Sequence, residues 1–195
     1  PIDRVRLYVT ALGLYECWIN DRRVGDQEMA PGWTDYASRV RYQVYDVTEL
    51  LREGDNAIGA LLGDGWYCGW VGLAKARENY GRRPALLAQL EIAHRDGSPT
   101  HIDSDERWRW HASPILASDI MQGETVDARR DLGAWTEPGY DEEGWAAIAL
   151  AQAPAISLDA MSGPPVRAIR ELHPVSDPVR KGHPLFAPRW IFDLG

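Results

Sequence analysis

The chain has 195 residues, 45% of them hydrophobic and 26% charged, which is typical of a globular domain large enough to bury a core. Its formal net charge of −8 argues against nucleic acid and anionic membranes as natural partners. It carries no apolar run of membrane-spanning length and no signal peptide, so a cytoplasmic location is favoured over secretion. Because it starts at Pro1 without Met and stops in a strand-like run at Gly195, we expect a piece of a longer protein.

Alternation of apolar and polar residues dominates the first part of the chain. It predicts strands at residues 4–9, 14–19 and 41–47, with a polar turn at 20–25 that leads into a partner strand. Residues 48–56 indicate a short helical turn capped by glycine. The continuous apolar run 57–62 predicts a central strand that is buried on both faces.

The second half continues with short strands separated by turns. Residues 84–94 predict the clearest strand, with a hairpin turn at 95–98, a short strand at 108–110 and a final strand at 164–172. With no internal repeat, this pattern predicts an all-β sandwich over residues 1–174. The proline-rich residues 175–195 are predicted to be a linker and the first strand of a following domain.

Nine tryptophans are the most informative feature of the composition. An indole either fills the core of a small sandwich or offers a flat apolar face to a sugar ring. Trp18, Trp108 and Trp110 fall in predicted strands and are expected to pack, whereas Trp33 and Trp145 fall in turn motifs and are expected to anchor loops.

Residues 63–83 are rich in glycine and aromatics and lack periodicity, which predicts a long irregular loop of functional importance. A sugar needs carboxylate or amide groups for its hydroxyls and an aromatic face for its C–H side. The loop supplies both kinds of group through Asp64, Trp66, Tyr67, Trp70, Asn79 and Tyr80. The alternative is that Asp64 and Gly65 form a turn and that Trp66 packs beneath the loop.

A second acidic group contains Asp119, Glu124 and Asp127. Oxygen ligands at short, irregular spacing suit calcium, the one cofactor that this sequence suggests. Ion pairing of Glu124 or Asp127 with Arg129 or Arg82 is the other interpretation. We include Asp119 and Glu124 among the predicted sugar-binding residues, as a supporting pair beside the cleft.

No catalytic site is predicted. The carboxylate clusters at 103–106 and 141–143 lie in short turns without a pocket signature, and the five histidines have no zinc spacing. Cys17 and Cys68 stand in apolar or aromatic stretches and are expected to be buried thiols, with a single disulfide as the alternative.

Several motifs, in the same order along the chain, resemble the N-terminal domain of bacterial α-L-rhamnosidases of glycoside hydrolase family 78. The segments that carry the resemblance are spread over nearly the whole chain and lie at residues 12–21, 30–36, 42–48, 63–67, 85–90, 123–129 and 192–195. One departure is Val126, which stands where the motif Gly-Glu-Thr-Tyr-Asp-Ala-Arg has an aromatic residue.

The resemblance implies a galactose-binding-like jelly-roll sandwich that precedes an (α/α)₆ catalytic barrel. In that family the catalytic acid and base lie in the barrel, which is not in this chain. Some members carry a related sandwich that binds L-rhamnose with calcium. The implied partners are a rhamnose-containing glycan and the barrel and other β-domains of the parent chain. The implied function is that of a non-catalytic accessory domain, either for carbohydrate recognition or as a purely structural interdomain module.

Overall fold

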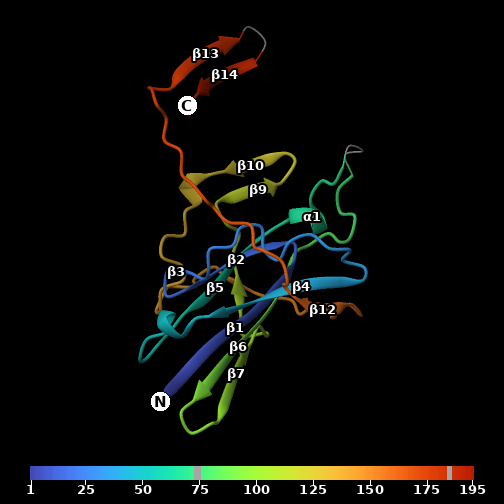
Figure 1. The fold of residues 1–195 in the computed structure, drawn as a ribbon, viewed down its shortest axis with the longest axis vertical. Helices are drawn as coiled ribbons and strands as arrows, with labels where there is room; N and C mark the ends of the chain where they lie inside the picture. The colour runs from blue at the N-terminus through green and yellow to red at the C-terminus, as the bar shows by residue number, and fades with distance from the viewer. Residues whose placement is uncertain (73–75, 184–185) are drawn as a thin grey trace.

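The computed structural model describes the chain except for residues 73–75 and 184–185. Its main layer is a five-stranded sheet (Figure 1). In spatial order, its strands are β12 (Ser157–Ala160), β4 (Arg39–Asp46), β1 (Ile2–Leu12), β6 (Ala85–His94) and β7 (Pro99–Asp103). All neighbours in this sheet are antiparallel except β12 and β4, which run parallel.

The second layer is a three-stranded sheet in which β2 lies between β3 and β5. Its strands are β3 (Arg22–Arg23), β2 (Leu14–Ile19) and β5 (Ile58–Gly63). The two layers share one core, in which Val5, Leu7 and Val9 of β1 pack with Cys17 and Ile19 of β2. The expected alternation is therefore confirmed, and the chain is an all-β sandwich.

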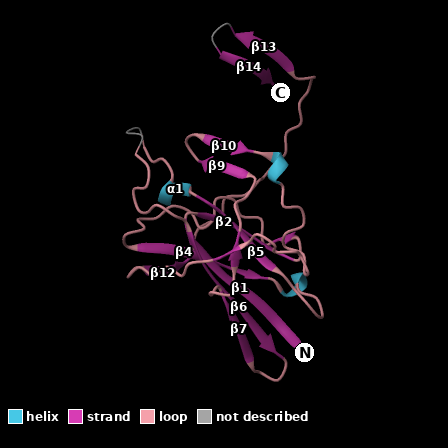
Figure 2. Cartoon of the chain, turned by 180° about the vertical axis from the view of Figure 1, so that it is seen from behind, coloured by secondary structure: helices cyan, strands magenta, loops and turns pink. Residues whose placement is uncertain are grey.

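The remaining elements are short (Figure 2). Three two-stranded ribbons pair β8 with β11, β9 with β10 and β13 with β14. The first ribbon consists of β8 (Arg109–Trp110) and β11 (Ala146–Ala147), and the second of β9 (Ile115–Asp119) and β10 (Gly123–Val126). The third consists of β13 (Val179–His183) and β14 (Phe186–Ile191). The helices are α1 (Gly65–Cys68) and 3₁₀ turns at Thr48–Leu50 and Ala128–Arg130. No helix among the described residues is long and apolar enough to cross a membrane.

Two expectations about secondary structure are wrong. The run 57–62 is not a central strand, because β5 lies at the edge of its sheet and is mostly half-buried. Residues 164–172 form no strand; only Arg167 makes an isolated bridge, to Gln27. Two prolines open that segment, and Ile169 is 96% exposed, so nothing packs its apolar side chains into a sheet.

The segment after residue 174 contains a hairpin where mainly a linker was expected. Strands β13 and β14 pair antiparallel and stand away from the sandwich, joined to it by a single stretch of chain (Figures 1 and 2). Pro184, one of the prolines that suggested a linker, lies outside the described residues. The domain boundary near residue 174 stays a prediction.

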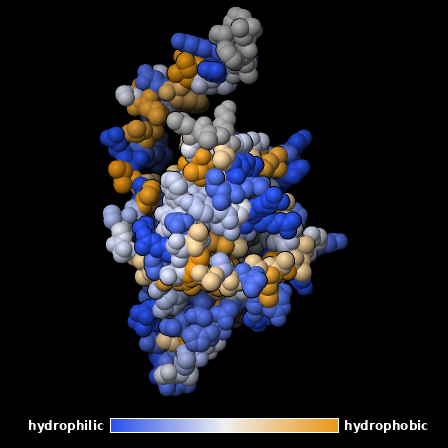
Figure 3. All heavy atoms as spheres, turned by 90° about the vertical axis from the view of Figure 1, so that its right-hand side faces the viewer, coloured by the Kyte–Doolittle hydropathy of each residue, from blue (hydrophilic) through white to orange (hydrophobic). Residues whose placement is uncertain are grey.

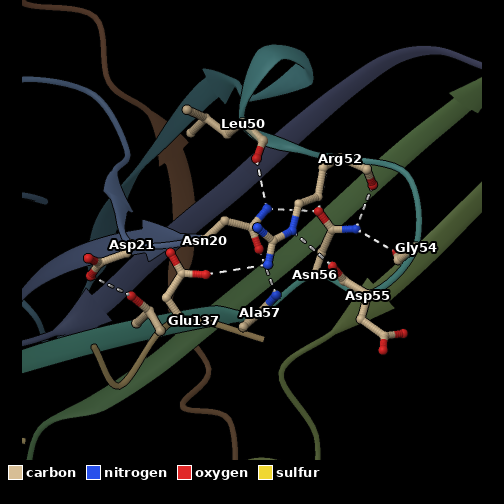
Figure 4. Close-up of polar contacts among 10 residues, drawn as sticks. Asn20, Asp21, Leu50, Arg52, Gly54, Asp55, Asn56, Ala57 and Glu137 are labelled. Carbon is tan, nitrogen blue, oxygen red and sulfur yellow. Dashed lines mark hydrogen bonds and ion pairs between the residues drawn. The ribbon is translucent and has the colours of Figure 1, made fainter. Parts of the chain in front are cut away.

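A polar network ties the turn after β2 to the loop before β5 (Figure 4). The Asn20 side-chain amide donates to the Leu50 carbonyl at 2.9 Å and to Asn56 Oδ1 at 2.8 Å, and its oxygen accepts from the Ala57 N–H. Arg52 extends the network by donating to Glu137 at 3.3 Å. The segment that carries Trp135 is thereby attached to the sandwich.

Candidate functional site

The predicted loop at 63–83 begins with one turn of helix, α1, rather than irregular chain. Gly65 has a φ of +53° and a Cβ there would contact the Leu14 side chain, so glycine is required where β5 turns into α1. The helical turn buries Cys68 and leaves Trp66 and Tyr67 half-buried. Residues 73–75 of the predicted loop lie outside the described residues.

Trp66 stacks on Trp33, a partner that the sequence did not predict. The two ring centroids are 6.0 Å apart and the rings are nearly parallel, at 4°. Trp33 comes from the loop at 30–36 and remains 49% exposed. The pair therefore presents an indole surface to solvent, supported from behind by a second indole. No signal in the sequence linked these two loops, because their contact is purely tertiary.

Tyr67 and Tyr80 have packing partners. Both make edge contacts with the buried ring of Tyr36, at centroid distances of 5.3 and 5.1 Å. A Cβ at Gly81 would collide with the Tyr67 ring, so the chain passes directly over it. Burial raises the pKa of the Tyr36 hydroxyl. Tyr67 and Tyr80, both predicted to bind sugar, thus have direct packing contacts within the domain.

Asp64 forms an ion pair within the loop. Its Oδ2 accepts from the Arg77 guanidinium at 2.6 Å, and Arg77 Nε also reaches the Cys68 carbonyl at 3.5 Å. Nothing in the sequence pointed to an ion pair between these two residues, which lie 13 positions apart. Both side chains stay partly exposed, at 31% for Asp64 and 45% for Arg77, so the pair offers an acceptor and donors side by side. Asn79 donates to the Ala76 carbonyl at 3.4 Å.

Asp119 ties the β9–β10 hairpin to the chain after α1. Its Oδ2 accepts from the Trp70 N–H at 2.7 Å, and its Oδ1 accepts from the N–H groups of Met121 and Gln122. Burial raises the pKa of this carboxyl, but the three backbone donors outweigh burial, and the pKa is lowered overall. Asp119 therefore positions the segment that carries Trp70.

The rest of the acidic group is also engaged in local contacts. Glu124 accepts from the Ser118 hydroxyl at 2.9 Å, and Asp127 pairs with Arg129 at 2.8 Å. The ion-pair interpretation is confirmed for Asp127. Among the described residues, no three His, Cys, Asp or Glu side chains are grouped so that they could hold a metal ion. This arrangement gives no support to a calcium site.

The structure gathers most of the predicted residues around α1. Asp64, Trp66, Tyr67 and Trp70 lie on or beside the helix, and contacts with Tyr67 and Trp70 bring Tyr80 and Asp119 to the same region. Glu124 lies on β10, where its one described hydrogen bond is to Ser118. Two open hollows of about 570 and 450 Å³ lie beside β4 and the loop at Gly25, and neither is lined by a predicted site residue.

A second group of tryptophans lies on the outer face of the β2–β5 sheet. Trp135 makes an edge contact with Trp18 at 5.8 Å and stacks with Trp145 at 6.3 Å. A Cβ at Gly59 would collide with the Trp135 ring, so the indole lies directly on the strand. The expected packing is confirmed for Trp18 and wrong for Trp110, which is 53% exposed.

Both cysteines are free and buried, as expected. Burial raises the pKa of each thiol to about 12. Thiols with such pKa values are protonated near neutral pH, so neither is prepared for nucleophilic chemistry.

Comparison with known sequences gives one consistent family. The profile of the α-L-rhamnosidase N-terminal domain matches residues 1–170. An α-L-rhamnosidase of Streptomyces avermitilis is 45% identical over the whole chain, and one of Alteromonas is 33% identical over 88% of it. The chain spans only about a fifth of the length of these relatives, 18% and 19% respectively.

Solved structures agree with the sequence comparisons. The S. avermitilis α-L-rhamnosidase, complexed with L-rhamnose, matches 89% of this chain with a TM-score of 0.85 and 47% identity, over 17% of its own length. The Aspergillus terreus α-L-rhamnosidase matches 91% of this chain with a TM-score of 0.86 and 42% identity, over 21% of its length. This chain belongs to the family of α-L-rhamnosidase N-terminal domains.

Proposed function

We propose that this chain is a non-catalytic accessory domain of a longer enzyme that hydrolyses terminal α-L-rhamnosides, and that it helps to recognise rhamnose-containing glycans. The relatives that it matches along its length are α-L-rhamnosidases, and each is about five times longer. We assign hydrolysis to the remainder of the parent protein, because the carboxylate clusters at 103–106 and 141–143 of this chain lie outside any predicted catalytic site.

The observation that carries the recognition role is the exposed Trp33 indole stacked on Trp66. A pyranose ring has an apolar C–H face that suits an indole surface. The adjacent Asp64–Arg77 pair would supply an acceptor and donors for neighbouring hydroxyls. In this proposal Trp33 and Trp66 contact the apolar face of the sugar, and Asp64 and Arg77 form hydrogen bonds with its hydroxyls. The contacts of Tyr67, Tyr80 and Asp119 stabilise the loop.

Titration of the isolated chain with L-rhamnose tests this role. We expect calorimetric heat at millimolar sugar and protection of tryptophan fluorescence from iodide quenching, with L-fucose as a control 6-deoxy sugar of another configuration. Parallel titrations with and without calcium test the cofactor. Absence of both heat and protection would overturn the recognition role. A chromogenic rhamnoside should show no turnover by this chain alone.

A purely structural interdomain role is the second candidate, and exposed apolar side chains favour it. Leu116, Met121 and Val126 on the β9–β10 hairpin are each about half exposed. Apolar surface also follows the upper part of the molecule, along the segment that leads to β13–β14 (Figure 3). Hydrogen exchange distinguishes the two roles: sugar-independent protection of the Trp33 loop in the parent enzyme would favour docking over recognition.

A further inference from the structure

Strand β4 has a stretch of edge that no strand covers. At residues 43–46 one edge of β4 pairs with β1, whereas β12 occupies the opposite edge only at residues 39–42 (Figure 1). The uncovered edge borders the hollow of about 450 Å³, which lies between β4, the loop at 25–27 and residues 160–167. A free edge beside a hollow has room for another length of chain.

The hydrogen bonds of the ladder show which backbone groups point toward β1. The Val47 N–H donates to the Val5 carbonyl at 3.0 Å, so these two residues form a hydrogen-bonded pair. In an antiparallel ladder such pairs alternate with pairs whose backbone groups point outward. By this alternation, Gln43 and Tyr45 direct their N–H and C=O groups to β1.

The intervening residues of β4 direct their backbone groups to the other edge. The Tyr42 carbonyl does so, since it accepts from the Met161 N–H at 2.9 Å on the β12 side. Val44 and Asp46 follow at the same spacing, and within the described residues their outward N–H and C=O groups have no backbone partner. Two donors and two acceptors at the repeat of a strand are the groups that an added strand would bond.

Prolines prevent β12 from filling this edge itself. If β12 continued in its parallel register, the Asp46 carbonyl would need an N–H from Pro165. Proline has no N–H, and Pro164 precedes it. The chain instead diverges to the loop at 25–27, where Arg167 forms an isolated bridge with Gln27. The edge beyond residue 42 therefore stays open.

Residues 168–173 have the complementary property, a strand-forming sequence without a partner strand. They overlap the run 164–172 that predicts a strand, yet they form none here. All of them are exposed, with Ile169 at 96% and Leu172 at 47%. The segment leads from the sandwich toward β13–β14 (Figure 1), so it does not cover the β4 edge of its own molecule.

We propose that residues 168–173 of one copy of this chain add as an antiparallel strand to the free β4 edge of a second copy. In the register that places Arg170 opposite Asp46, Leu172 lies opposite Val44. Opposite charges and apolar side chains are thereby matched on one face of the sheet. Because each copy has both the edge and the segment, the contact forms twice and closes a symmetric dimer.

The charges and the end of the segment fit this register. Asp46 accepts from the N–H and hydroxyl of Thr48 and forms no ion pair within the described part of the chain, although Arg6 lies across from it on β1. Pro174 falls opposite Tyr42, where β12 already occupies the edge. The added strand thus reaches a residue without an N–H where no further bond is needed.

Sedimentation of the unmodified chain tests the proposal. Over concentrations from about 10 μM to about 1 mM, a range that covers weak association, we expect monomer to convert to dimer. Amide hydrogen exchange then identifies the contact. The N–H groups of Val44 and Asp46 should exchange more slowly as the dimer forms, while those of Gln43 and Tyr45 should be slow at every concentration because β1 already protects them.

Matched variants test the segment and its register. Leu172→Pro removes the N–H that would bond the Val44 carbonyl, at both contacts of the dimer, and should weaken association at least about tenfold. Glu171→Pro is the control, because in this register the N–H of residue 171 points away from the edge, and it should change association less than about twofold. Arg170→Glu places like charges opposite each other and should weaken association about fivefold.

Thermal unfolding at low concentration should be the same for all three variants and the unmodified chain, because the substituted side chains are exposed and lie outside the strands. A chain that stays monomeric over the whole range would overturn the proposal. Slow exchange of Val44 and Asp46 in the monomer would overturn the choice of a second copy as the occupant. Equal effects of Leu172→Pro and Glu171→Pro would overturn the register.

Discussion

The two tryptophan groups of this domain use the same side chain for different purposes. Trp135 lies against Gly59 of β5 and contacts both Trp18 and Trp145. Trp33 stacks on Trp66 and leaves about half of its surface in solvent. An indole with neighbours around it contributes to stability, whereas an indole with one free face is available to a ligand. Stability and binding should therefore respond separately to changes in the two groups.

The largest expected effect comes from inserting a side chain under Trp135. Gly59→Val would place carbon atoms where the Trp135 ring lies, because even a Cβ there collides with it. We expect a loss of about 3 kcal/mol in the free energy of unfolding, from overpacking and displacement of the indole. Urea unfolding measures this loss of stability. Gly163→Ala, where a Cβ makes only ordinary contact, is the control and should change stability by less than about 0.5 kcal/mol.

Truncating one tryptophan from each group sharpens the contrast. Trp135→Ala should lower the free energy of unfolding by about 2 kcal/mol, since the ring is half-buried. It should leave rhamnose affinity in the folded protein unchanged. Trp33→Ala should lower that affinity about tenfold while costing about 1 kcal/mol, the contribution of one aromatic pair.

The control for Trp33 is Trp110→Ala, since Trp110 is similarly exposed but lies on β8, away from α1. It should leave both sugar binding and stability nearly unchanged. If Trp135→Ala abolished sugar binding in a folded protein, or if Trp110→Ala weakened it as much as Trp33→Ala, the division between the two groups would be wrong.

A smaller effect is expected when the tie between the β9–β10 hairpin and the chain after α1 is weakened. Asp119→Asn keeps the size of the side chain but removes the charge and one acceptor oxygen from the three N–H donors. We expect a loss of about 1 kcal/mol in stability and faster hydrogen exchange at the Trp70 N–H. Ser118→Ala, which removes only the bond to Glu124, is the comparison. Unchanged exchange at Trp70 would contradict the role of Asp119.

The smallest effects are those of pH, and they have opposite signs in the two regions. The folded pKa of Asp119 lies below its ordinary value of 3.8, so its stabilisation is present above pH 3.8 and is lost as pH falls through the folded pKa. Glu16, on β2 two residues before Trp18, behaves oppositely. Burial raises its pKa above 4.5, outweighing the lowering by Arg23, so its stabilisation is present below pH 4.5 and is lost as pH rises through the folded pKa.

Stability measured across this acid range in Asp119→Asn and Glu16→Gln variants checks these signs. In each variant, the pH dependence of stability that comes from the substituted carboxyl should disappear, and the pH dependence that comes from the other carboxyl should remain. A stability profile that keeps the same slope in both variants would show that neither carboxyl is coupled to folding in this way.

Much of the sandwich could be predicted from the sequence because alternation reports which side of a strand is buried. Val5, Leu7 and Val9 alternate with polar neighbours, and all three are in the core. The prediction failed for 57–62, since an edge strand covered by Trp135 looks as apolar as a central one. It also failed for 164–172, where apolar residues have no partner sheet.

The candidate site was only partly predictable. The density of glycine and aromatics pointed to residues 63–83, and Asp64, Trp66 and Trp70 do lie together around α1. The sequence could not indicate that Arg77 pairs with Asp64 or that Tyr67 and Tyr80 pack on Tyr36. Such contacts depend on how the loops approach one another in the folded protein, and they produce no periodic pattern in the sequence.

The sequence by itself determined the all-β class, the strand faces that form the core, the burial of both cysteines and the family resemblance, because these follow from local patterns and motifs. Only the tertiary structure decided which tryptophans pack against the sheet and which, such as Trp33 and Trp110, stay about half exposed. Trp33 and Trp135 are chemically identical, and Trp33 became the candidate ligand surface because it stacks on Trp66 and still leaves about half of its surface in solvent.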